Sequence, residues 1–336
     1  MTAAPTSPRR IPVKRVVQAV VGLGLAAVLL IWGLPYFAQT SWGEVFGVLG
    51  TVHPAQALLF TALVVAGLYC YTFVMVGAMP GLSHPRALIL NLCGSSVSNL
   101  LPGGGAVGLA ATYTIAKSWG FSAARVTTMA VVTGVWNVLS RAALPIIAIF
   151  GLSWGAKDLP SRMEEAAWAA IITGGIVLAV FVLAVATDRG ARLAGSTIDR
   201  GIRLVRRSHT DKVKTPLADL RSRIADTVQT GWLKMTLGMV GFFGLYYVLF
   251  LLCTRATGTD LPFGQLFAAY AIGRLLTAVG VTPGGLGVTE TGTAAAMAGV
   301  VLFSIFTHLM EVPLGALGWL AWSLMPKASG EELEDA

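Results

Sequence analysis

Five ionisable side chains lie inside apolar stretches of this chain: Arg141, Arg274, Glu290, His308 and Glu311. An ionisable side chain is costly to bury in hydrocarbon, so each of these residues is a candidate for substrate binding or ion movement. Glu290 is the strongest candidate because it stands shortly after a Pro-Gly-Gly turn, in the first turns of an expected helix. Its carboxylate either binds a substrate or balances the positive end of that helix.

The other four ionisable residues each have a functional and a structural interpretation. Arg274 precedes the same turn, so it either pairs with Glu290 or binds a lipid phosphate. Arg141 stands late in its apolar run and either contributes to the site or snorkels to the outer interface. His308 and Glu311 are three positions apart on one helical face, where they form either a proton relay or a structural pair.

Two proline–glycine clusters, at 102–105 and 283–287, interrupt apolar segments. Proline ends the preceding helix because it lacks a backbone donor, and the following glycines permit a tight reversal. A new helix then begins near Ala106 and near Val288, with unpaired N–H groups that attract an anion. The residues predicted to bind substrate are Pro102, Gly103, Gly104, Gly105, Arg141, Arg274, Pro283, Gly284, Gly285, Gly287 and Glu290.

A run of polar residues precedes the first cluster. Such residues either line a cavity or hydrogen-bond neighbouring membrane helices. They are Asn91, Ser95, Ser96, Ser98 and Asn99.

Several other chemistries are excluded by the sequence. Gly103, Gly105 and Gly108 fit the spacing G-x-G-x-x-G, but no β-α-β unit is expected around them, so no dinucleotide site is predicted. No G-x-x-x-x-G-K-[ST], H-E-x-x-H or G-x-S-x-G sequence occurs. The three cysteines stand far apart in apolar runs, which indicates buried thiols rather than disulfides or metal ligands. We therefore expect no cofactor, no metal and no enzymatic activity.

The composition indicates an all-α polytopic membrane protein. Of the 336 residues, 55% are hydrophobic and 12% are charged, whereas a soluble domain carries about 25% charged residues. Such a chain cannot cover a water-facing exterior, which excludes a soluble enzyme.

Six apolar runs are long enough for a full span, since a bilayer-crossing helix needs roughly 20 residues. Two further hydrophobic regions, 87–119 and 263–300, contain the proline–glycine clusters and are expected to form broken hairpins. The six full spans are 16–38, 55–79, 126–152, 166–187, 232–253 and about 300–325.

Basic residues predict the orientation of these segments, because cytoplasmic loops carry an excess of Lys and Arg. The N-terminal segment 1–15 and the polar loop 188–230 are both rich in basic residues, so both are expected to be cytoplasmic. Both can be cytoplasmic only if the hairpin 87–119 is re-entrant, entering and leaving on that side. The acidic tail 326–336 is then cytoplasmic too, in a multi-pass protein of the inner or plasma membrane.

The loop 188–230 also bears on partners. It serves either as the orientation signal or as a surface that lies on anionic membrane lipid. Its mixture of basic and acidic residues argues against nucleic-acid binding.

The two broken hairpins occupy the same place in two four-element blocks, 16–152 and 166–325. The first is expected to enter from the cytoplasm and the second from outside, which predicts an inverted 4+4 repeat. Many secondary transporters have this architecture, with sites near the membrane midplane at discontinuous helices. The alternative is coincidence, since Gly and Pro are common in membrane helices.

The motifs L-L-P-G-G at 100–104 and P-G-G-L-G-V-T-E at 283–290 resemble the lysylphosphatidylglycerol synthase transmembrane region family. This family is the flippase-like domain of multiple-peptide-resistance-factor proteins, and the resemblance covers about 16–325. It implies translocation of aminoacylated phosphatidylglycerol, and related domains accompany lipid-linked sugar enzymes. The chain departs from the family where members carry charged residues, because Thr133, Gly134 and Asn137 occupy that stretch.

The sequence therefore predicts a non-enzymatic translocase for an anionic or aminoacylated phospholipid or a lipid-linked headgroup. The half-helix starts would hold the phosphate, with Arg274 and Arg141 complementing its charge. Glu290 would bind a cationic headgroup or a coupling proton. Two other functions are compatible with the sequence: a small-solute secondary transporter, and a scaffold for a separate lipid-modifying or glycosyl-transferring enzyme.

Overall fold

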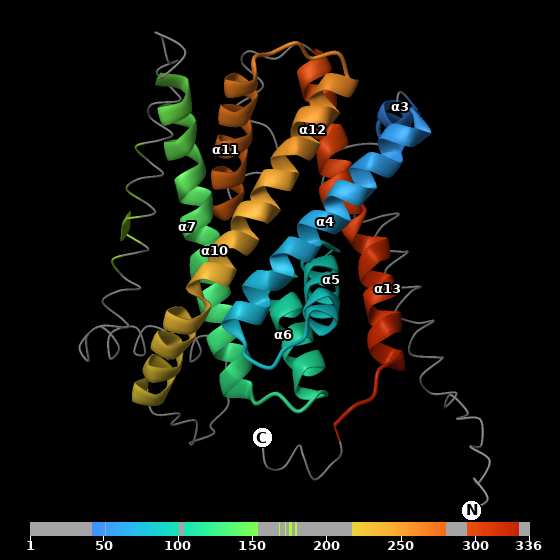
Figure 1. Ribbon diagram of the computed structural model, residues 1–336. Coiled ribbons are helices and arrows are strands. Elements are labelled where there is room, and N and C mark those ends of the chain that lie inside the picture. Colours follow the sequence, from blue (N-terminus) through green and yellow to red (C-terminus); the bar gives the residue numbers. More distant parts are fainter. Residues whose placement is uncertain are drawn as a thin grey trace, which may run out of the picture.

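The computed structural model describes residues 42–50, 52–100, 104–153, 217–279 and 294–328, with a few isolated positions between 168 and 179 (Figure 1). Every element in these residues is a helix, which confirms the predicted α class of membrane protein. In chain order the elements are α3 (Trp42–Gly50), α4 (Pro54–Ala78), α5 (His84–Leu100), α6 (Gly104–Lys117), α7 (Ala123–Ser153), α10 (Leu217–Ala256), α11 (Phe263–Val279), α12 (Ala294–Ser304), a π-helical turn (Ile305–Leu309) and α13 (Glu311–Leu324).

Four stretches of the described residues are long and apolar enough to cross a membrane: Pro54–Ala78, Ala123–Ala148, Ser222–Ala256 and Ala298–Leu324. They overlap four of the six predicted spans. The other two predicted spans, 16–38 and 166–187, lie outside the described residues.

The helix α10 begins well before its apolar part. It starts at Leu217, so the last residues of the segment 188–230, expected as a loop, are helical and continue directly into the span. The charged residues of this extension include Arg223 and Asp226. The remaining part of that segment, 188–216, lies outside the described residues.

The helices α5 and α6 form an antiparallel pair, and each is shorter than the roughly 20 residues that a membrane-crossing helix needs. They contain 17 and 14 residues, which corresponds to about 25 Å and about 21 Å of helix. Both lie in the lower half of Figure 1, whereas α11 lies in the upper half. The chain thus enters and leaves the α5–α6 hairpin at the same end of the molecule, as expected for a re-entrant segment.

Basic and aromatic side chains gather at that end. The Arg86 guanidinium lies 5.3 Å from the Trp119 ring centre, and the Lys327 ammonium lies 3.9 Å from that of Trp322. Arg125 donates to the Pro80 carbonyl at 2.5 Å. The assignment of this end to the cytoplasmic side, where Lys and Arg are enriched, stays a prediction.

The helices α4 and α10 cross along much of their length and form the most extensive helix pair of the described residues. Glycine makes the close approach possible, because a Cβ on Gly231 would collide with the backbone of Gly77. The other main contacts are reciprocal: α5 packs against α13, and α7 packs against α11. In the predicted repeat, the first arm of each hairpin would therefore contact the last span of the other block.

The last span is one continuous path through α12, the π turn and α13. A π turn inserts an extra residue into a helical turn and is frequent at functional sites. Here it contains His308 and ends just before Glu311. The turn that was expected around 283–287 falls in 280–293, outside the described residues.

Candidate substrate pocket

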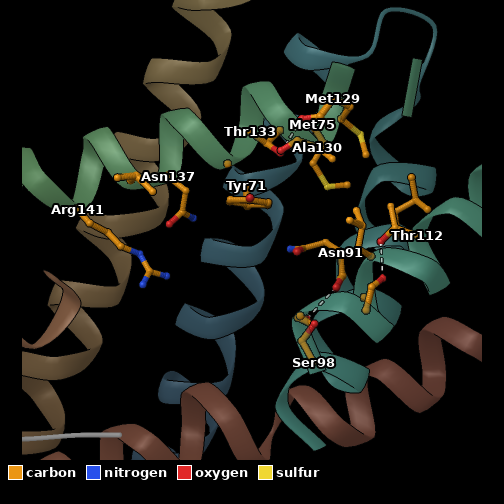
Figure 2. Close-up of a pocket in the computed structure, with 18 residues that line it drawn as sticks. Tyr71, Met75, Asn91, Ser98, Thr112, Met129, Ala130, Thr133, Asn137 and Arg141 are labelled. Carbon is orange, nitrogen blue, oxygen red and sulfur yellow. Dashed lines mark hydrogen bonds between the residues drawn. The ribbon is translucent and has the colours of Figure 1, made fainter. Parts of the chain in front are cut away.

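A pocket of about 460 Å³ lies between α4, α5, α6 and α7, within the size range of small-molecule sites. Figure 2 shows Arg141 at one side of it and Asn91, Ser98 and Thr112 at the other, with Tyr71 between them. The pocket therefore has a cationic side and a neutral polar side. Two of the helices around it, α4 and α7, are long and apolar enough to cross a membrane, so the polar lining lies against membrane-length helices.

The neutral lining consists of amides and hydroxyls. Several hydroxyls donate to carbonyls of their own helix, as Ser95 does to Asn91 at 2.8 Å, Thr112 to Gly108 at 3.0 Å and Thr133 to Met129 at 2.8 Å. Their donor hydrogens are used in this way, so their oxygen lone pairs are left to accept hydrogen bonds from a ligand. The side-chain amides that line the pocket belong to Asn91 and Asn137.

Glycines allow α5 and α6 to meet closely enough to form this wall. A Cβ on Gly104 would collide with the backbone of Ser98, and a Cβ on Gly108 with the Ser98 hydroxyl and the Gly94 carbonyl. Gly105 lines the pocket and has open space where a Cβ would stand. The two predicted site residues that the structure describes in this cluster thus differ: Gly104 packs the hairpin, and Gly105 faces the pocket.

The start of α6 supplies a positive helix end to the same wall. This helix begins at Gly104, and Gly105 is its second residue. The first N–H groups of a helix lack intrahelical acceptors, and the helix dipole favours an anion near them. The predicted partners Pro102 and Gly103 lie outside the described residues.

The two arginines predicted for the site come together. The packing of α7 against α11 brings Arg141 and Arg274 within electrostatic reach of each other. Arg141 lines the pocket, so it points into the protein instead of snorkelling to the interface. This position is compatible with the predicted role of Arg141 in the site, which stays a prediction.

Arg274 is held in an aromatic cage and is only 9% exposed. Its guanidinium carbon lies 5.2 Å, 5.3 Å and 4.9 Å from the ring centres of Tyr246, Tyr270 and Phe303. Cation–π attraction at a buried site is worth up to about 2 kcal/mol. The cage therefore fixes this cation beside Arg141.

Glu311 connects the last span to the first hairpin. Asn99 donates a hydrogen bond to its carboxylate at 2.8 Å, across the contact between α5 and α13. Glu311 is only 9% exposed. His308 shares a hydrogen bond of 3.0 Å with Thr307, so the hydrogen bonds of Glu311 and His308 run to different neighbours.

The polar run before the first cluster fulfils both expected roles. Asn91, Ser95 and Ser98 line the pocket. Ser96 packs against Gly315 of α13, and Asn99 donates to Glu311. The two faces of α5 therefore divide the run between cavity lining and helix contact.

A comparison with protein-family models matches residues 19–325 to the lysylphosphatidylglycerol synthase TM region. The chain belongs to this family. The match confirms the resemblance carried by the two proline–glycine motifs, and it points to a lipid-related function in a membrane. A comparison with curated proteins gave no match.

The family's second motif falls where the structure gives no description. Pro283, Gly284, Gly285, Gly287 and Glu290 all lie in 280–293. Their assignment to the site, and the expected pairing of Arg274 with Glu290, stay predictions. In the described residues, Arg274 interacts electrostatically with Glu311.

The pocket also contains residues that the sequence analysis did not select. Tyr71, Thr133 and Asn137 line it, and the last two were noted only as replacing a charged cluster of the family. A signal for them was present, because Thr133, Asn137 and Arg141 recur every four residues and form one polar stripe on an apolar helix. Among the described residues no group of metal-ligating side chains comes together.

Proposed function

We propose that this protein is a non-enzymatic translocase that moves an anionic phospholipid, or a lipid-linked headgroup, between the two leaflets. The observation that carries the proposal is a polar pocket beside the membrane-length helices α4 and α7, with Arg141 in its wall. Membership of a lipid-related membrane family supports it. The substrate is a lipid with negative charge on its headgroup.

The lining suits such a headgroup. Arg141 and the positive start of α6 would bind the phosphate, since both favour an anion. Hydroxyl oxygens and the carboxamides of Asn91 and Asn137 would bind glycerol or sugar hydroxyls. Arg141 is the charged residue of the described lining, and no carboxylate accompanies it there. This favours an anionic over an aminoacylated headgroup.

The surroundings of the pocket favour a lipid over a small solute. Apolar side chains on α6 and α7 are exposed beside it: Val107 is 45% exposed, Leu109 43% and Val131 38%. Leu109 itself also lines the pocket. A headgroup would enter between these two helices while its acyl chains stay against the apolar surface.

The proposal includes the topology that the sequence predicts. The basic end of α5, α6 and α13 would face the cytoplasm of a cell membrane, with both termini on that side. The reciprocal packing of α5 on α13 and of α7 on α11 supports an inverted repeat. Because the chain has no nucleotide-binding motif, lipid would move down a gradient or together with an ion.

The test uses two glycines with equal local space. A Cβ on either Gly134 or Gly244 meets nothing within 4 Å, but only Gly134 lines the pocket. In vesicles containing fluorescent phosphatidylglycerol and the purified protein, we expect Gly134→Leu to lower the rate of leaflet exchange about tenfold or more. The matched control Gly244→Leu should retain the wild-type rate.

Two results would count against the proposal. Wild-type protein that moves fluorescent phosphatidylglycerol no faster than empty vesicles would exclude translocation of this lipid. Equal rates for Gly134→Leu and wild type would exclude this pocket. A folded but inactive protein that co-purifies with a lipid-modifying enzyme would support the scaffold alternative.

A further inference from the structure

Glu311 is a buried carboxyl group inside a span and lies behind the pocket wall. Asn99, near the end of α5, donates to its Oε2 atom at 2.8 Å. Ser95, one turn earlier on α5, also interacts with it, and Ser95 lines the pocket. The carboxyl group and the pocket thus both border α5, and Ser95 interacts with the first and lines the second.

Charged or titratable groups from several elements lie around Glu311. Arg274 of α11 and Tyr246 of α10 interact electrostatically with it, and Arg141 of α7 and His308 of the π turn interact with Arg274. Arg274 interacts electrostatically with both Glu311 and Arg141. The carboxylate therefore acts on Arg274, and Arg274 in turn repels Arg141.

This arrangement sets up a competition between two anions. An ionised Glu311 offsets part of the positive charge of Arg274, and a headgroup phosphate at Arg141 would draw on that same charge because Arg274 and Arg141 interact. Protonation of Glu311 would remove the competing negative charge and strengthen phosphate binding. By linkage, phosphate binding strengthens proton binding to the same extent.

We infer that Glu311 is a proton-binding site coupled to the pocket, so that an anionic headgroup and a proton bind and move together. The inference rests on the proposed function for the identity of the anion. The proton comes from water, joins the Glu311 carboxylate as the headgroup binds, and returns to water when the headgroup leaves. Asn99 lies just before the first proline–glycine cluster, so a displacement of that hairpin would reach the carboxyl group directly.

Proton uptake on lipid binding tests the inference without any need for transport. Phosphatidylglycerol is added to the purified full chain in detergent, and its binding heat is measured near pH 7 in buffers of different ionisation enthalpy. We expect wild type to take up protons on binding, to a limit of about one proton per bound lipid. Glu311→Gln should still bind the lipid, because a glutamine can accept the hydrogen bond from Asn99. It should take up no proton, because a carboxamide does not titrate.

A second readout is leaflet exchange as a function of pH. We expect the wild-type rate at limiting lipid to rise roughly five- to tenfold from about pH 8 to about pH 6. Glu311→Gln should have a flat profile. His308→Gln and Asp260→Asn are the controls, since the first removes the nearby imidazole and the second an exposed acid paired with Arg255. Both should keep the wild-type pH profile.

The outcomes separate the two proposals. Lipid binding without proton uptake, or a flat wild-type profile, would overturn the coupling while leaving translocation intact. Proton uptake that depends on Glu311 in a protein that moves no lipid would support the site and contradict the translocase. Loss of uptake in His308→Gln but not in Glu311→Gln would overturn the assignment to Glu311, and a failure to bind phosphatidylglycerol would overturn both.

Discussion

The predicted first block, 16–152, and the predicted second block, 166–325, carry different chemistry in the residues that the structure describes. In the first block, α5 and α6 present amides, hydroxyls and glycines around an open pocket. In the second, α11 and the last span carry Arg274 and Glu311, both buried and close-packed among aromatic rings and helices. The first block thus provides space and hydrogen-bonding groups, and the second provides fixed charge.

This difference shows how a polar site can exist at membrane depth. Neutral groups can satisfy part of their hydrogen bonding within their own helices, as Thr112 and Thr133 do, and so can border a cavity. A bare charge there is costly and needs compensation. Arg274 has three aromatic faces and Glu311 has Asn99, which offset that cost. Arg141 belongs to both regions, because it lines the pocket and interacts electrostatically with Arg274.

The largest expected effect comes from a substitution at the contact between α5 and α6. Gly108→Leu would drive a side chain into Ser98 and the Gly94 carbonyl, so we expect a loss of about 3 kcal/mol in the free energy of unfolding. Gly105→Leu, which meets open space, should cost less than about 1 kcal/mol. Thermal unfolding in detergent measures both. Equal losses for the two variants would contradict the division between packing and pocket-facing glycines.

An intermediate effect distinguishes the two arginines. Arg274→Met removes three cation–π contacts and leaves Glu311 with less compensation, so stability should fall by about 1–2 kcal/mol. Arg141→Met relieves repulsion with Arg274, so stability should stay within about 0.5 kcal/mol of wild type or rise. Lipid exchange should nevertheless fall in Arg141→Met. Denaturation curves that rank the two variants in the reverse order would refute this assignment of roles.

The smallest effect concerns the link between the blocks. Asn99→Ala removes one hydrogen bond between α5 and α13, and such bonds in membrane proteins average about 0.6 kcal/mol. Glu311→Gln keeps an acceptor for Asn99, so its stability should match wild type. A double-mutant cycle of Asn99→Ala with Glu311→Ala, each of which removes the hydrogen bond, measures the pair directly. A coupling energy near zero would show that the hydrogen bond does not contribute to stability.

Much of the architecture follows from the sequence. Long apolar runs fix membrane-length helices, because unsatisfied backbone polar groups are too costly in lipid. Three predicted spans agree closely with Pro54–Ala78, Ala123–Ala148 and the apolar part of α10, and the fourth with Ala298–Leu324. The proline–glycine cluster at 102–105 predicted two helices joined by a break, and α5 and α6 lie on either side of it. The proline–glycine motifs identified the family.

The partners of individual side chains were decided only by tertiary packing. Periodicity places Arg141 and Arg274 in apolar helices, but only the contact of α7 with α11 makes them neighbours. Likewise Asn99 and Glu311 are 212 positions apart and meet because α5 packs against α13. Local sequence encodes which face of a helix is polar. Which helix lies against that face depends on the shape of both surfaces, down to the glycines that let α5 and α6 close around a pocket.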